Sequence, residues 1–109
     1  MSSLKIISYN VNGIRSALNK GLSNWIEAND FDIILFQEIK ANFEDIPVEI
    51  FEHLGYQYSF FPAQKKGYSG VGAIYRKNAD QIIHGMGIPE FDFEGRLMRL
   101  DFGNLTIIN

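Results

Sequence analysis

Two short apolar runs, residues 4–9 and 33–37, each end in a side chain that could do chemistry. The first runs into Asn10 and the second into Glu38, and a helix-like segment over about residues 15–28 separates them. A strand–helix–strand unit of this size has parallel strands and a right-handed crossover. Open α/β sheets carry their sites at the carboxyl edge of such strands. We therefore expect Asn10 and Glu38 to lie side by side.

The remainder of the chain predicts a short helix followed by mostly antiparallel strands, which gives a mixed α/β (α+β) fold. Ser16 is the expected N-cap of the first helix, and Gly21 weakens that helix. The pair Gly103-Asn104 predicts a tight hairpin between the last two strands. The expected later elements are a helix near residues 47–54 and strands over 56–61, 71–76, 81–84, 97–102 and 105–109.

Composition bounds the class of protein. The 109 residues are 46% hydrophobic and suffice for one domain with a core. No apolar run approaches the roughly 20 residues that span a bilayer, and the start lacks the pattern of a secretory signal. Without cysteine there are no disulfides or thiolate metal sites. We expect a cytoplasmic protein, at the nucleoid of a bacterium or in the nucleus of a eukaryote.

The net charge of −3 conceals an asymmetry. Residues 27–52 hold eight acids and one base, whereas residues 53–79 hold no acid. The second stretch interleaves bases with aromatic residues, which suits a polyanion such as nucleic acid. The alternative interpretation, equally weighted, is that its aromatic residues form strand core and its basic residues are solvated turn residues. Its members are Lys65, Lys66, Arg76 and Lys77 with Tyr56, Tyr58, Phe60, Phe61, Tyr68 and Tyr75.

Glu38 offers hard anionic oxygen, which suits Mg²⁺ bound by one or two carboxylates, water and substrate phosphate. Such an ion implies phosphoryl chemistry, and the Asn10 amide can orient a neighbouring carboxylate or water. His53 and His84 stand apart from this pair and are expected to be structural or exposed. Arg15 and Lys20 follow at the start of the helix as anion contacts or as ordinary solvated bases.

Four motifs together resemble the exodeoxyribonuclease III family of abasic-site endonucleases, within the wider endonuclease/exonuclease/phosphatase fold. The first two fit the wider group, and the last two point to the DNA-repair branch. They occur in the family's order and spacing across essentially the whole chain. The motifs are Ser8-Tyr9-Asn10-Val11-Asn12-Gly13-Ile14-Arg15, Leu35-Phe36-Gln37-Glu38-Ile39-Lys40, Gly67-Tyr68-Ser69-Gly70-Val71-Gly72 and Glu94-Gly95-Arg96.

The resemblance implies a Mg²⁺-dependent phosphodiesterase, with Mn²⁺ as an alternative ion, that acts on double-stranded DNA at abasic sites and 3′ ends. Glu38 resembles the metal ligand, and Asn10 the amide that hydrogen-bonds the catalytic aspartate. Asn12 and Lys40 resemble outer residues of the metal site. The residues that resemble DNA-backbone contacts are Arg15, Lys20, Tyr68 and Arg96.

Members of this family are more than twice as long, and their fold is a four-layered α/β sandwich. We therefore expect residues 1–109 to be the N-terminal part of one such domain, inactive alone. It should expose a sizeable apolar patch or bury it by self-association or against the missing C-terminal part. One alternative is a non-catalytic module for nucleic-acid binding or assembly, and another is a phosphatase for small or lipid substrates.

Overall fold

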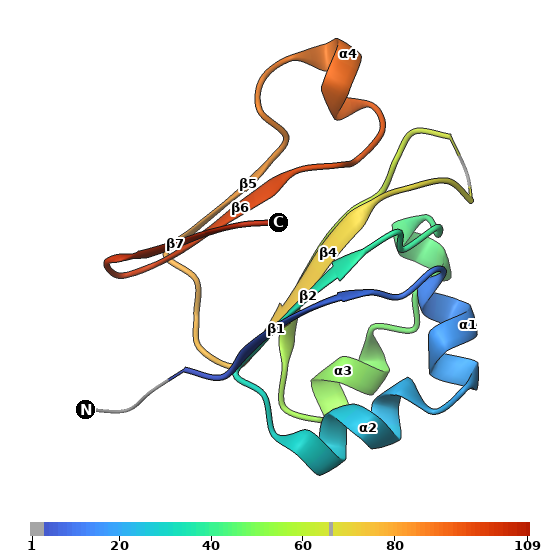
Figure 1. Ribbon diagram of the computed structural model, residues 1–109, viewed down its shortest axis with the longest axis vertical. Helices are drawn as coiled ribbons and strands as arrows, with labels where there is room; N and C mark the ends of the chain where they lie inside the picture. Colours follow the sequence, from blue (N-terminus) through green and yellow to red (C-terminus); the bar gives the residue numbers. More distant parts are fainter. Residues whose placement is uncertain (1–3, 66) are drawn as a thin grey trace.

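The computed structural model describes residues 4–65 and 67–109, and it consists of two stacked sheets with helices on one outer face (Figure 1). Helices α1, α2 and α3 cover one face of the larger sheet, and the smaller sheet lies against the opposite face. This arrangement confirms the predicted mixed α/β class.

The four-stranded sheet has the order β1-β2-β4-β3 and contains the predicted parallel pair. Strand β1 (Ile6–Asn10) runs parallel to β2 (Ile33–Gln37), with Asn10 opposite Gln37. Strand β4 (Val71–Tyr75) lies antiparallel between β2 and β3 (Gln57–Phe61). Because β2 and β4 are central and covered on both faces, their residues are almost all buried.

The smaller sheet is antiparallel, in the order β5-β6-β7. Its strands are β5 (Gln81–His84), β6 (Met98–Phe102) and β7 (Leu105–Ile108), and β6 and β7 form the predicted hairpin. Alternate residues of β6 are buried and pack against the facing side of β2 and β4. The alternation that the sequence predicted for this strand is confirmed.

The helical layer differs from the predicted single helix over residues 15–28. Two helices, α1 (Ile14–Asn19) and α2 (Leu22–Asn29), meet at Gly21, whose φ of +106° ends the first helix and starts the second. The predicted Ser16 N-cap is wrong, because Gly13 occupies that position and no side chain caps the helix. Helix α3 (Glu49–His53) lies within the predicted region.

Two short elements were not predicted. They are a 3₁₀ turn, η1 (Phe43–Asp45), and helix α4 (Pro89–Asp92) in the connection between β5 and β6. Both are less than two turns long, so no hydrophobic periodicity can develop in them. Among the described residues, no helix has the length and apolarity that crossing a bilayer requires.

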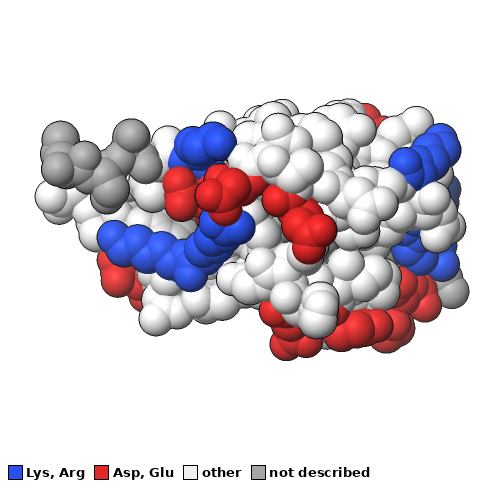
Figure 2. Space-filling view, turned by 90° about the horizontal axis from the view of Figure 1, so that it is seen from below, with Lys and Arg blue, Asp and Glu red and all other residues white. Residues whose placement is uncertain are grey.

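The basic and aromatic stretch does not form one surface. Tyr56 and Tyr75 are buried, while Arg76 pairs with Asp30 and stacks on the Tyr56 ring at 4.9 Å. Arg76 and Lys77 are exposed after β4, the turn around Tyr68 is exposed elsewhere in the stretch, and Lys66 lies outside the described residues. Seen from below, lysine and arginine side chains lie among acidic ones (Figure 2). Most of this stretch therefore consists of core aromatic residues and solvated bases, not of a single polyanion-binding surface.

Exposed apolar side chains lie on the outermost strands, as expected for a sheet with so few covering helices. In β1 and the residue run before it, Leu4 and Ile6 are more than two-fifths exposed, and Ile108 in β7 is 61% exposed. These strands end their sheets on one side within the described part of the chain.

Candidate active site

Asn10 and Glu38 meet at the carboxyl ends of β1 and β2. The register pairs Asn10 with Gln37, so the residue after Gln37 emerges next to the Asn10 side chain. Asn10 Nδ2 donates a hydrogen bond to Glu38 Oε2. The backbone N–H of Asn12 donates to Asn10 Oδ1 at 3.0 Å, which fixes the amide so that its NH₂ faces the carboxylate. The predicted juxtaposition is confirmed.

Lys40 closes this pair into a ring of four residues, which we call the Asn10–Glu38 network (Asn10, Asn12, Glu38 and Lys40). Its Nζ donates to Asn12 Oδ1 at 2.6 Å and lies 3.5 Å from Glu38 Oε1. The hydrogen bond from Asn10, and then the Lys40 ammonium, lower the pKa of Glu38 against the opposing effect of burial. Glu38 is therefore held as a carboxylate.

The backbone around the network is unusual and tightly tied. Asn12, Glu38 and Lys40 have φ values of +47°, +52° and +53°, in the left-handed region that side chains normally avoid. Glu38 O accepts from Gly13 N at 2.8 Å, and Lys40 N donates to Ser69 O at 2.8 Å. These bonds hold the strained loop from both sides, as is typical of preorganised functional sites.

The glycine-rich turn packs against the same loop. A Cβ on Gly70 would lie 2.7 Å from Ile39 Cγ1, and Gly70 has a φ of +88°. Gly70 O accepts a hydrogen bond from Ile39 N at 3.1 Å. A Cβ on Gly72 would lie 2.2 Å from the Phe60 ring. The motif therefore contains glycine where the turn approaches the loop that carries Glu38.

One groove joins three of the four sequence motifs. Glu38 and Lys40 line it from the loop after β2, Tyr68 from the glycine-rich turn and Arg96 from the connection before β6. Tyr68 is 49% exposed, and the Arg96 guanidinium lies 3.3 Å from the Glu94 carboxylate in an exposed ion pair. An anion in this groove would contact a phenol and two cationic groups beside one carboxylate.

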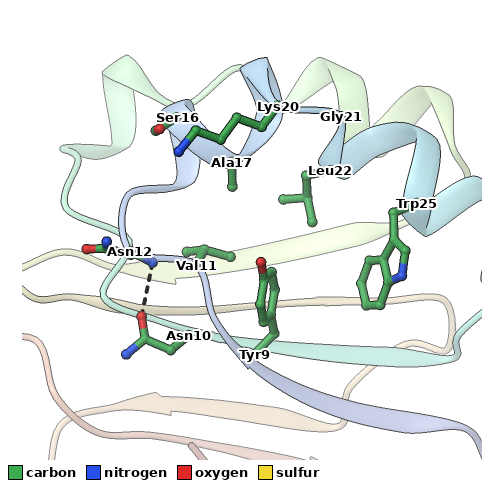
Figure 3. Close-up of a pocket in the computed structure, with 10 residues that line it drawn as sticks. All are labelled: Tyr9, Asn10, Val11, Asn12, Ser16, Ala17, Lys20, Gly21, Leu22 and Trp25. Carbon is green, nitrogen blue, oxygen red and sulfur yellow. Dashed lines mark hydrogen bonds between the residues drawn. The ribbon is translucent and has the colours of Figure 1, made fainter.

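Lys20 lines a different groove, on the helical side of β1, together with Asn10 and Asn12 (Figure 3). The rings of Tyr9 and Trp25 lie side by side along it, with centroids 5.9 Å apart. These two rings were not predicted as site residues. They are recognised by their exposure on an outer strand and helix, which the sequence alone does not reveal. Arg15 is exposed in the first turn of α1 and lines neither groove.

The ligand types of the Asn10–Glu38 network are oxygen atoms. Within the residues that the structure describes, no group of three or more histidine, cysteine or acidic side chains could hold a metal. His53 lies in α3, and His84 hydrogen-bonds Ser59 and stacks on Phe61, as structural residues do. Glu38 offers carboxylate oxygens beside Asn12 Oδ1, which accepts a hydrogen bond from Lys40. Carboxylate oxygen suits a hard cation that retains water and phosphate ligands.

Comparisons with known proteins agree with this geometry. The model of the Endonuclease/Exonuclease/phosphatase family matches residues 7–109. The chain belongs to this family. It is 37% identical to a DNA-(apurinic or apyrimidinic site) endonuclease of Dictyostelium discoideum over 97% of its length, and 35% identical to an exodeoxyribonuclease of Bacillus subtilis over 96%. An AP endonuclease structure from Archaeoglobus fulgidus superimposes with a TM-score of 0.86 at 31% identity over 98% of the chain.

The match confirms the resemblance to abasic-site endonucleases and exodeoxyribonuclease III that the motifs indicated. The chain covers 29% of the Dictyostelium protein, 41% of the Bacillus protein and 40% of the Archaeoglobus structure. It therefore corresponds to the N-terminal part of the family's fold and spans less than half of each relative.

Proposed function

We propose that this chain forms the N-terminal part of a single DNA-repair phosphodiesterase domain that cleaves DNA at abasic sites and removes nucleotides from 3′ ends. The observation that carries the proposal is the Asn10–Glu38 network, which opens into a groove shared with Tyr68 and Arg96. The names of the relatives support the DNA-repair branch over other members of the family.

In this proposal Glu38 holds Mg²⁺, or Mn²⁺ in its place, and keeps its negative charge because Asn10 and Lys40 favour the ionised form. The ion would polarise the scissile phosphate and stabilise the charge on the leaving oxygen. Asn10 orients the carboxylate, and Asn12 fixes the position of the Lys40 ammonium beside it. Lys40 adds positive charge where an anionic phosphodiester would approach.

DNA contacts come from two sides of the network. Tyr68 and Arg96 border the groove that contains Glu38, and Lys65 stacks over the Tyr68 ring at 5.2 Å. Lys20 and the exposed Arg15 lie on the helical side of β1, where they would contact phosphates of the same duplex. Contacts of this kind fix the register of the duplex without reading its sequence.

Binding of Mn²⁺ to the 109-residue chain tests the metal site directly. Paramagnetic Mn²⁺ should broaden the NMR signals of the Asn10 and Asn12 side-chain amides, because both lie in the Asn10–Glu38 network. Glu38→Gln should abolish this broadening. Glu44→Gln is the matched control, since Glu44 is exposed in η1, and it should leave the broadening unchanged. Broadening that persists in Glu38→Gln would contradict the assignment.

An incision assay on an abasic-site duplex with Mg²⁺ tests the reaction. We propose that the chain alone leaves the duplex uncut, because the loss of one member of a cooperating catalytic set costs orders of magnitude in rate. Incision that survives Glu38→Gln would place the chemistry elsewhere. A non-catalytic module would bind the duplex without any need for Mn²⁺ at Glu38, and a phosphatase for small or lipid substrates would bind soluble phosphoesters in competition with the duplex.

A further inference from the structure

Asn109 extends the ladder of the β6–β7 hairpin. Its N–H donates to Met98 O at 2.8 Å, and its O accepts from Met98 N at 3.0 Å. The backbone of Asn109 therefore belongs to the smaller sheet, but its half-buried side chain reaches across to the larger sheet.

The Asn109 carboxamide binds two neighbouring strands of the larger sheet. Its Nδ2 donates to Phe36 O at 3.1 Å and to Gly72 O at 2.8 Å, and these two residues are paired across β2 and β4. Its Oδ1 accepts from Gln37 Nε2 at 2.8 Å. Phe36 and Gly72 are buried, so their carbonyl groups would lose a partner that water does not easily replace.

These contacts lie directly behind the Asn10–Glu38 network. Phe36 and Gln37 immediately precede Glu38, and Gly72 follows the Ser69–Gly70 turn that binds the backbone of residues 39 and 40. Gln37 Nε2 also donates to Ser8 Oγ at 3.0 Å, two residues before Asn10. Asn109 thus ties β2 to β4 directly, and the Gln37 side chain extends this link to β1.

We propose that Asn109 is a positioning residue for the metal site at Glu38, an inference that rests on the proposed function. It acts through β2 and β4: it fixes where these strands end and so sets the strained backbone at Glu38. The loop after β2 holds residues in the left-handed region, a strained conformation that persists only where surrounding contacts fix it. The hydrogen bonds of Asn109 to β2 and β4 supply such contacts.

Amide hydrogen exchange in the 109-residue chain tests this role without metal or DNA. In Asn109→Ala, exchange of the Ile39 and Lys40 amides should accelerate by about tenfold beyond any change in core amides, since about one hydrogen bond's worth of local stability is lost. The side-chain amide signals of Asn10 should move toward those of an unbonded amide. Gln37→Met removes only the Gln37 bonds and should give a smaller change at the same positions.

Ser59→Ala is the matched control, because the Ser59–His84 hydrogen bond (2.8 Å) also links the two sheets. It should leave the Asn10 amide signals and the exchange at residues 39 and 40 unchanged. If Asn109→Ala and Ser59→Ala produce the same uniform acceleration, or if Gln37→Met and Asn109→Ala leave the network unchanged, Asn109 is structural only. If the unsubstituted chain does not bind Mn²⁺, the proposed function is contradicted. The exchange measurements would still decide whether Asn109 positions the backbone at residues 39 and 40.

Discussion

At the scale of single residues, two glycines of the same turn illustrate how a motif can contain residues with different roles. Gly67 has a φ of +75°, and a Cβ there would meet no atom within 4 Å. Gly70 has a φ of +88°, and a Cβ there would press into Ile39 and Pro62. At Gly67 only the positive φ requires glycine. At Gly70 the absence of a side chain also lets the turn approach the loop that carries Glu38.

Gly70→Ala should lower the free energy of unfolding by about 3 kcal/mol, because a strained φ and an overpacked contact add together. Gly67→Ala should cost about 1 kcal/mol, because only the strained φ applies. Urea denaturation of both variants measures the difference. Equal losses would show that the contact with Ile39 relaxes without cost.

At the scale of elements, the strands were largely predictable and the helices less so. Strands β2 and β5 have the predicted bounds, because each is a short apolar run bounded by polar residues and glycine or acidic residues beyond them. The helix over residues 15–28 was predicted as one because Leu18, Leu22 and Ile26 keep a helical spacing through Gly21. That spacing survives in the two helices, while the chain direction between them depends on the φ of Gly21.

The β6–β7 hairpin contains a titratable contact that makes its stability depend on pH. Arg99 Nε (3.0 Å) and Thr106 Oγ1 (2.9 Å) donate to Asp101 Oδ1 and lower its pKa in the folded chain, with the Arg99 hydrogen bond as the larger cause. Since the folded pKa lies below the unfolded one, this contact stabilises the fold above pH ~4 and is lost as the pH falls further.

Asp101→Asn should therefore reduce the difference in unfolding free energy between pH 6 and pH 3. Arg99 and Thr106 keep their positions in this variant, so the loss is confined to the titrating group. Thermal unfolding across this pH range measures the effect. Asp80→Asn is the control, since Asp80 accepts from the Gly103 N–H of the same hairpin turn. An equal change in both variants would contradict the assignment to Asp101.

At the scale of the whole molecule, the sequence predicted which residues meet but not how they are held. The parallel β1–β2 pair was enough to place Asn10 beside Glu38, because topology alone fixes that edge. The Ser69–Gly70 turn and Asn109 reach the site from distant parts of the chain, through hydrogen bonds to backbone atoms. Backbone carbonyls carry no sequence signal, so these supports could not be predicted from residue types.

The outer edge of β1 is where we expect self-association of the chain to occur. Within the described residues this strand pairs only with β2, and Ile6 is 42% exposed on it. An exposed apolar edge strand favours pairing with another chain, and a lysine on such a strand opposes it. Ile6→Lys should therefore lower the sedimentation-averaged mass of the chain at tens of micromolar, while the long lysine stem keeps its apolar contacts.

Phe91→Lys is the control, because Phe91 is 55% exposed but lies in α4 rather than on a strand edge. A chain that sediments as a monomer before substitution, or that responds equally to both changes, would show that the β1 edge does not drive association.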